Sequence, residues 1–194
     1  MRVSKAVQTD AGILFISAKT KTAIPTSCVL VRDALVQATL DPAVRAIGRR
    51  AQAGCVSAPV DVPAIIIVRD DGRFYLDVDE VPHAPDWAKT TAVLENEGFR
   101  PLVLTATDIN REPHLTNARL VWNCRMNPVG ITVRMSVLQV LADDGPMTLS
   151  QLLSSIQSDR DPSPAVMAMA CSDLIELDLM SVPLGPKTIV RARA

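Results

Sequence analysis

The sequence predicts an α/β domain with a small mixed sheet and flanking helices, followed by a small winged helix-turn-helix domain. Up to residue 127, short apolar runs typical of buried strands alternate with stretches of helical periodicity. After the Asn-Pro-Val-Gly stretch at 127–130, the pattern changes to three short helices and a Gly-Pro turn, the plan of a winged helix. We therefore predict domains at residues 1–127 and 131–194, joined by a short linker.

The first helix of the α/β domain is predicted at residues 26–39, where apolar residues recur at helical spacing. Thr26 or Ser27 is suited to cap its N-terminus, and Asp41-Pro42 ends it. Residues 1–23 alternate weakly, so we expect a short strand or an arm there.

A β-hairpin is predicted next. Residues 63–68 form a β-branched run typical of a buried strand, and 73–78 alternate as a second strand. The turn signal Asp70-Asp71-Gly72 lies between them. The two strands should therefore be adjacent and antiparallel.

Three elements complete this domain. Residues 87–97 are predicted to be a helix that Gly98 ends at its C′ position. Residues 101–105 form a third short apolar strand, and 115–126 a further helix. Trp87 and Trp122 lie on these two helices, where packing in a core or an interface is expected.

The second domain is predicted to contain helices at 133–142 and at 149–156, the latter capped by Thr148. A third helix follows Pro162 and Pro164 and continues to about residue 177, and residues 182–191 suit a two-stranded wing with Gly185-Pro186 at its turn.

The composition limits what the chain can bind. With 194 residues, 48% of them hydrophobic and 3% aromatic, the chain can bury a real, mainly aliphatic core. Its 20 basic and 21 acidic side chains nearly cancel. Because tight non-specific nucleic-acid binders usually carry a basic excess, any contact with DNA must be local.

The cysteines and the N-terminus predict a cytoplasmic protein. None of the four cysteines forms a C-x-x-C pair, no signal-peptide pattern opens the chain, and no apolar run approaches the ~20 residues that span a bilayer. The cysteines are better explained as small buried hydrophobes than as ligands. His83 and His114 lack ligand spacing, apart from Asp86 three residues after His83, and are expected to be solvated.

Candidate DNA contacts form two groups. Arg45, Arg49 and Arg50 follow Asp41-Pro42 and either contact phosphates or form a solvated charged turn. The second domain contains five basic and seven acidic side chains. Only Lys187, Arg191 and Arg193, in the wing and tail, offer positive charge there.

The third helix of the winged helix is the element expected to read bases in a major groove. Residues 163–176 contain no Arg, Lys, Asn or Gln that could do so. This helix is better suited to packing against protein. Met167 and Met169 then either contact a partner or lie in the domain's own core.

Two stretches resemble the TnsA-like transposon endonuclease family. The run V-R-D-A-L-V-Q-A-T-L-D-P-A-V at 31–44 resembles the family helix E-S-x-x-E-R-D-x-x-x-x-x-x-F-D-P-x-V. The run G-F-R-P-L-V-L-T-A-T-D-I at 98–109 resembles the family strand G-x-x-x-x-V-x-T-E-x-D-I, and Pro113, Leu115, Asn117, Ala118 and Arg119 follow at the expected spacing. The resemblance extends from about Thr26 to Arg125 and, more loosely, to the end.

The resemblance implies a restriction-endonuclease-like core before the winged helix. In such nucleases a helix carboxylate, an Asp that opens one strand and an E/D-x-K triplet on the next hold a divalent metal that activates water. The Lys adds positive charge beside the attacking water or the scissile phosphate.

In this chain most of the corresponding positions have changed. The two helix glutamates fall on Ser27 and Val31, the strand Asp falls on Ala64, and the triplet falls on Asp77-Val78-Asp79. Only Asp77 keeps a ligand type, and Asp79 places negative charge where positive charge belongs. A metal held by one carboxylate would bind weakly, so we expect no metal and no other cofactor.

A migrated site is the alternative. Asp61, Asp77 and Asp79 would then gather one Mg²⁺, with Lys89 replacing the missing lysine. The simpler explanation is that these are solvated charges at strand ends and on a helix face.

The sequence therefore predicts a non-catalytic TnsA-like protein used as a binding or assembly module in DNA transactions. Its partner would be a transposase-like or regulatory protein, with DNA bound only weakly and no membrane contact. An active metal-dependent endonuclease with a rearranged site and a winged-helix transcription regulator remain alternatives. The oligomeric state is not predicted.

Overall fold

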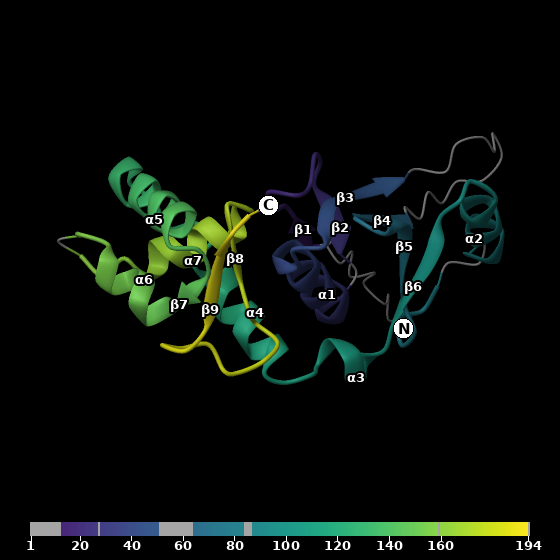
Figure 1. Ribbon diagram of the computed structural model, residues 1–194. Helices are drawn as coiled ribbons and strands as arrows, with labels where there is room; N and C mark the ends of the chain where they lie inside the picture. The colour runs from purple at the N-terminus through teal and green to yellow at the C-terminus, as the bar shows by residue number, and fades with distance from the viewer. Residues whose placement is uncertain (1–12, 27, 51–63, 84–86, 159, 194) are drawn as a thin grey trace, which may run out of the picture.

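The computed structural model describes residues 13–26, 28–50, 64–83, 87–158 and 160–193 as a mixed α/β structure (Figure 1). In chain order the elements are β1 (Ile13–Phe15), β2 (Ile24–Thr26), α1 (Val29–Leu40), β3 (Val44–Arg50), β4 (Ala64–Arg69), β5 (Gly72–Val78), α2 (Trp87–Asn96), β6 (Arg100–Leu104), α3 (Ala106–Ile109), α4 (His114–Asn123), α5 (Ile131–Asp143), β7 (Met147–Thr148), α6 (Leu149–Ser155), α7 (Ser163–Cys171), β8 (Ile175–Leu177) and β9 (Ile189–Ala192). Within the described residues, no helix is long and apolar enough to cross a membrane.

The main sheet has the strand order β3-β4-β5-β6. β3, β4 and β5 are antiparallel neighbours, and β6 is parallel to β5. The predicted hairpin is confirmed, because Ile67 pairs with Phe74 across the tight turn that ends at Gly72. Gly72 has a φ of 148°, a value that L side chains rarely adopt.

Helices lie on both sides of this sheet, with α1 on one side and α2 on the other (Figure 1). Alternate residues of a strand point to opposite faces. On β5, Phe74, Leu76 and Val78 therefore join the large core that includes α1, whereas Tyr75 packs with Leu94 of α2.

The first strand of the sheet differs from the prediction. Residues 44–50 form β3, not the charged turn expected around Arg45, Arg49 and Arg50. Val44 and Ile47 are buried on this strand, so a run dominated by arginines still supplies two core residues.

The start of α1 also differs from the prediction. Thr26 belongs to β2, and Cys28 occupies the N-cap position without a side-chain hydrogen bond. Ser27, the other predicted cap, lies outside the described residues. The helix ends before Asp41, as expected.

The C-terminal part, residues 131–193, contains α5, α6, α7 and a three-stranded sheet of order β7-β9-β8. The predicted cap of α6 is confirmed, since Thr148 and Gln151 form a reciprocal capping box. The third helix is shorter than predicted. It ends at Cys171, Asp173 adopts a φ of 59°, and 175–177 form β8, which pairs with β9.

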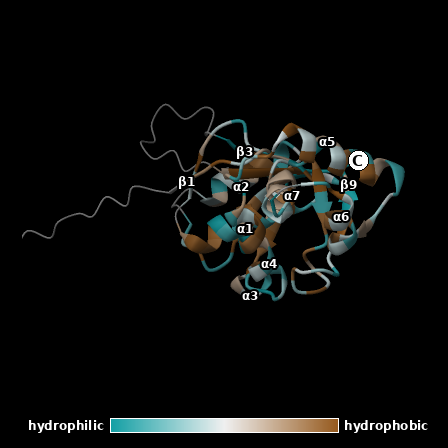
Figure 2. Ribbon diagram, turned by 90° about the vertical axis from the view of Figure 1, so that its left-hand side faces the viewer, coloured by the Kyte–Doolittle hydropathy of each residue, from teal (hydrophilic) through white to brown (hydrophobic). Residues whose placement is uncertain are grey.

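One continuous hydrophobic core joins the N-terminal part, residues 13–126, to this C-terminal part. Helix α7 lies against α4, and hydrophobic segments run along α7 and the strands near it (Figure 2). Residues Val166–Cys171 are all buried, with Met167 7% and Met169 0% exposed. The two methionines therefore lie in the core, and the predicted reading helix is covered by its own chain.

Candidate functional site

Two of the positions that the resemblance aligns with catalytic residues, Ala64 and Asp77, lie on the α2 side of the main sheet. Ala64 opens β4 and packs with Tyr75 and Leu94 in the small cluster under α2. Asp77 lies two residues after Tyr75 on β5, so its side chain points to the same face. The strand pairing thus brings the Ala64 and Asp77 positions to one surface.

Asp77 is engaged by a histidine. Its Oδ1 lies 2.7 Å from Nε2 of His83, and the two side chains are 21% and 35% exposed. The His83 ring stacks on Trp87, with a centroid distance of 4.8 Å and an interplanar angle of 11°. His83 is exposed in the loop after β5, as expected, and its ring lies between a carboxylate and an indole.

Tyr75 continues the cluster. Its hydroxyl donates a hydrogen bond of 2.9 Å to Oε1 of Glu95 on α2, and its ring meets Trp87 edge-on at 6.0 Å. Burial, assisted by Glu95, raises the pKa of Tyr75 to about 12. The phenol is therefore neutral near pH 7 and acts as a donor that fixes α2 on the sheet.

The described residues do not fit a divalent metal at this place. Ala64 offers a methyl group where a carboxylate is needed, and Asp77 is already bound to His83. Asp79 is exposed at the end of β5, where its backbone N–H donates to Leu104. No group of three His, Cys, Asp or Glu side chains within the described ranges could hold a metal ion.

The migrated site can be followed only in part. Lys89 is exposed on α2, whereas Asp61 lies outside the described residues. Val31, at the position of the second helix glutamate, is buried in the large core and faces no solvent. A carboxylate at that position would have to be accommodated among aliphatic side chains.

Two motif residues from the resemblance do meet. Arg119 of α4 donates from Nη2 and Nε to the carboxylate of Asp33 on α1, at 2.5 and 3.3 Å. The Asp33 side chain is 6% exposed. The pair joins stretches that lie 86 residues apart in the chain, which gives both residues a structural role.

The arginines predicted to contact DNA are largely engaged within the molecule. Arg45 binds Asp70 at 2.5 Å, and Nη2 of Arg50 binds Glu97 at 2.7 Å. Arg49 is exposed on β3. A guanidinium that is already paired with a carboxylate offers a phosphate little additional charge, so Arg49 is the best placed of the three.

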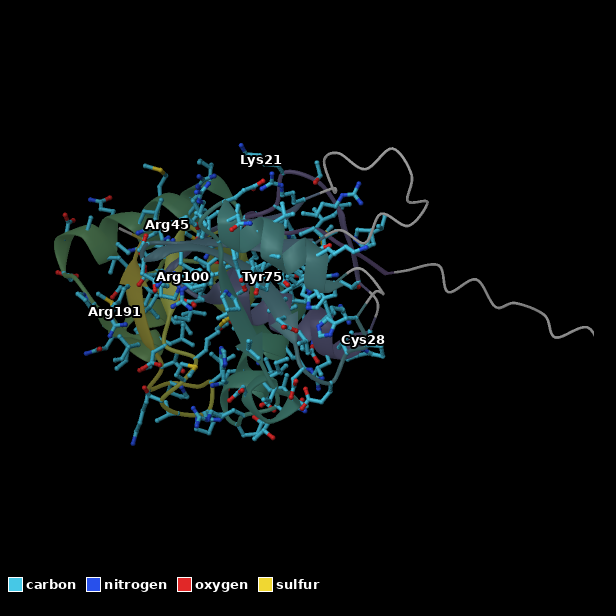
Figure 3. The ribbon with its side chains drawn as sticks, turned by 90° about the vertical axis from the view of Figure 1, so that its right-hand side faces the viewer. Lys21, Cys28, Arg45, Tyr75, Arg100 and Arg191 are labelled. Atoms are coloured by element: carbon cyan, nitrogen blue, oxygen red, sulfur yellow. The ribbon has the colours of Figure 1, made fainter. Side chains whose placement is uncertain are left out.

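The residues of the wing and tail separate in the same way. Lys187 and Arg191 are exposed, and Figure 3 shows Arg191 and Arg45 on different elements, β9 and β3. Arg193 has a side chain that is only 11% exposed and bridges the two parts of the chain. Its partners are Asp173 at 3.2 Å, Glu176 at 3.1 Å, and the carbonyl oxygens of Pro42 and Val44. Such a buried clamp is unsuited to contact phosphate.

No protein-family model and no curated protein matches the chain.

Proposed function

We propose that this chain is a non-catalytic, TnsA-like protein that serves as a binding or assembly module beside a protein partner in DNA transactions. The observation that carries the proposal is the state of Asp77. The one motif carboxylate that the chain retains is paired with His83, and the neighbouring strand supplies Ala64 where a second ligand is required.

The architecture supports the proposed family. A helix, three antiparallel strands, a second helix and a parallel strand follow one another around a mixed sheet, in agreement with a restriction-endonuclease-like core. The three helices and the β7-β9-β8 sheet that follow agree with a winged helix. The free thiols Cys28, Cys124 and Cys171 suit the cytoplasm that we propose as its location.

A role as a sequence-reading regulator is less well supported. In a winged helix the third helix enters the major groove. Here α7 is buried against α4. Of the predicted contacts, only Arg49, Lys187 and Arg191 are exposed and form no ion pair with another described residue. Scattered phosphate contacts of this kind give weak, salt-sensitive binding. Sequence-specific binding in the nanomolar range at physiological salt would favour the regulator instead.

A plasmid-nicking assay tests the proposal. The purified protein should not nick supercoiled DNA in Mg²⁺ or Mn²⁺ above a buffer control, because Ala64 and Asp79 leave neither a second ligand nor positive charge near the scissile phosphate. Asp77→Ala and Lys89→Ala should give the same result. Asp143→Ala, which removes an exposed carboxylate from α5, is the matched control.

Metal-dependent nicking that Asp77→Ala or Lys89→Ala abolishes, and that Asp143→Ala leaves unchanged, would refute the non-catalytic role. It would establish the active endonuclease with a rearranged site, in which Asp61 supplies a further ligand.

A further inference from the structure

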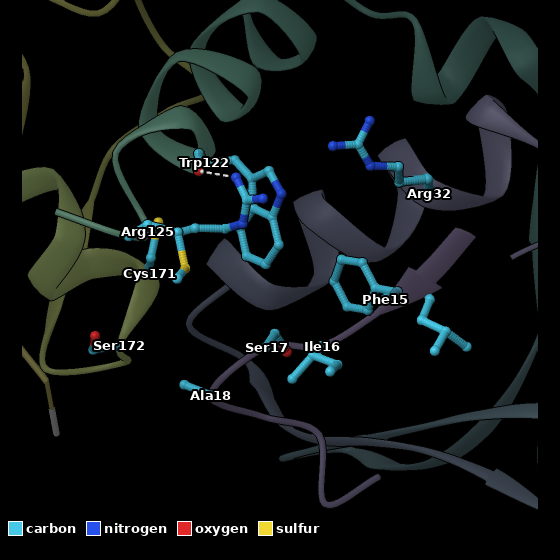
Figure 4. Close-up of a pocket in the computed structure, with 11 residues that line it drawn as sticks. Phe15, Ile16, Ser17, Ala18, Arg32, Trp122, Arg125, Cys171 and Ser172 are labelled. Carbon is cyan, nitrogen blue, oxygen red and sulfur yellow. Dashed lines mark hydrogen bonds between the residues drawn. The ribbon is translucent and has the colours of Figure 1, made fainter. Parts of the chain in front are cut away.

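A groove lies where β1 meets the ends of α4 and α7. It is a hollow of about 580 Å³ whose walls include Phe15, Trp122 and Cys171 (Figure 4). Phe15 stacks on Trp122 with a centroid distance of 5.3 Å and forms the apolar floor. At the rim, Leu14 is 61%, Ile16 63% and Met126 82% exposed. An apolar surface of this kind at the junction of the two parts favours a binding site over ordinary solvent exposure.

The groove runs along the edge of β1. Five consecutive residues, 14–18, line it. Of these, Leu14 and Phe15 belong to β1, and residues 16–18 follow it. Because neighbouring side chains of a strand point to opposite faces, a hollow that both Leu14 and Phe15 line lies at the edge of the strand. Among the described residues, β1 is paired on one side only, with β2, in a two-stranded sheet.

Pro25 identifies a backbone donor on this edge. Leu14 pairs with Pro25, which has no N–H and cannot take part in a hydrogen-bonded pair. The Leu14–Pro25 pair is therefore of the non-hydrogen-bonded kind, and the N–H and C=O of Leu14 point away from β2. Within the described residues, neither group has another backbone partner.

The charge of the groove indicates what binds there. Arg32 of α1 and Arg125, which follows α4, both line it, and no described lining residue is acidic. Figure 4 shows Arg125 beside Trp122 and Arg32 on the other side of that ring. The Arg125 guanidinium lies 5.1 Å from the Trp122 centroid and donates to its carbonyl oxygen at 3.2 Å.

These two arginines differ from the arginines that are paired with carboxylates elsewhere in the described part of the chain. Neither forms an ion pair with any described residue, whereas six other arginines do: Arg45, Arg50, Arg69, Arg100, Arg119 and Arg193. In a chain with a formal net charge of −1, the groove is thus locally positive.

We infer that the groove binds an extended segment of a partner protein in which apolar residues alternate with acidic ones. The segment adds a strand to β1 by hydrogen bonding to the outward N–H and C=O of Leu14, as in other cases of strand addition. Its apolar side chains cover the Phe15–Trp122 floor, and its carboxylates pair with Arg32 and Arg125. This inference rests on the proposed binding role and names the chemistry of the partner.

The thiol at the groove wall does not make it a reactive site. Burial raises the pKa of Cys171 to about 12, and its Sγ–H donates to the carbonyl oxygen of Val121 at 3.3 Å. The thiolate required for nucleophilic attack is therefore absent near neutral pH.

The probe is a short dye-labelled peptide in which Leu and Val alternate with Glu and Asp, followed by fluorescence anisotropy. Arg32→Gln and Arg125→Gln should each weaken binding by up to about fivefold, and both together by about twentyfold, as expected for partly exposed ion pairs. Arg134→Gln, an exposed arginine on α5, is the matched control and should leave binding unchanged. A peptide with Gln and Asn in place of its acidic residues should bind the wild-type protein about as weakly as the acidic peptide binds the double variant.

A backbone variant tests strand addition separately. Leu14→Pro removes the outward N–H without removing a bond to β2, whereas Leu14→Ala removes only the side chain. Leu14→Pro should therefore weaken the binding of the peptide more than Leu14→Ala does. Trp122 emission in a Trp87→Phe background shows whether the Phe15–Trp122 stack, and with it the fold around the groove, is kept.

Two peptide results would overturn the inference: no saturable binding up to about 1 mM peptide, or binding that neither arginine variant weakens. A dimer whose formation Leu14→Pro prevents would also overturn it, because the edge of β1 would then bind a second copy of the chain. None of these bears on plasmid nicking. Conversely, nicking would refute the proposed function without changing the peptide result.

Discussion

Asp77 shows how neighbours determine what a motif residue can do. Its place on a strand facing α2 follows from the alternation at 73–78. Its pairing with His83 does not, because the contact forms only when the chain turns back after β5 and Trp87 stacks on the imidazole. Sequence spacing therefore predicted the position of the carboxylate but could not predict that the His83 ring binds to it.

His114 provides a test of pH dependence at the residue scale. It lies at the start of α4, half-buried in a hollow of about 350 Å³ that Leu40 and Leu177 also line. Burial lowers its pKa below the ordinary 6.5, and Asp41 opposes this only in part. The unfolded chain therefore binds a proton at higher pH than the folded protein does.

The free energy of unfolding should consequently fall as the pH decreases below about 6.5 towards the lower pKa of the folded state, and should be insensitive to His114 above this range. We expect His114→Gln to flatten the decline of Tm between about pH 7 and pH 5. The comparison at about pH 8, where both forms are neutral, isolates any packing effect of the substitution. An equally steep decline in the variant would contradict the assignment.

At the scale of elements, helix ends and turns were predictable where local chemistry decides them. Thr148 at the N-cap of α6 and Gly98 after α2 are of this kind. β3 and β8 were not recognised, because 44–50 is rich in arginine and 175–177 continues a helical pattern. Both become strands by pairing with partners distant in the chain, β4 and β9.

The capping box of α6 can be tested directly. Thr148 Oγ1 accepts from the backbone N–H of Gln151 at 3.3 Å, and Gln151 Oε1 accepts from the N–H of Thr148 at 3.0 Å. Thr148→Ala should lower the free energy of unfolding by about 1 kcal/mol in urea denaturation. Thr148→Ser keeps the hydroxyl and should retain most of the stability. Equal losses of stability in both variants would show that Thr148 stabilises the protein through its place in β7 and not through the cap.

At the scale of the whole molecule, the buried interface between the two parts is the feature that sequence patterns could not predict. The change of pattern near residue 127 indicated two domains, and that division remains a prediction. Lys19, whose side chain is 2% exposed, binds Asp173 at 3.2 Å across the parts, and Arg193 reaches back to Pro42. Such contacts depend on three-dimensional packing between stretches that share no local pattern.

Asn117 makes a further connection between the two parts through all of its amide group. It is 1% exposed on α4 and belongs to the stretch that resembles the TnsA-like family. Its Nδ2 donates to the carbonyl oxygens of Leu179 and Val182 at 2.9 and 2.8 Å, and its Oδ1 accepts from the N–H of Leu184 at 2.7 Å. One amide thus holds the segment between β8 and β9 against the N-terminal part.

We therefore predict that Asn117→Ala lowers the free energy of unfolding by about 3 kcal/mol, because the buried carbonyl of Leu179 and the part-buried backbone groups of Val182 and Leu184 lose this partner. Asn123→Ala, an exposed asparagine on the same helix, should cost less than about 0.5 kcal/mol. Since the core is continuous, urea denaturation followed by Trp122 fluorescence and by the amide signals of α5 and α6 should give coincident transitions in wild type and variant alike. Separate transitions, with α5 and α6 unaffected by Asn117→Ala, would show instead that the two parts fold as independent units joined only at their surfaces.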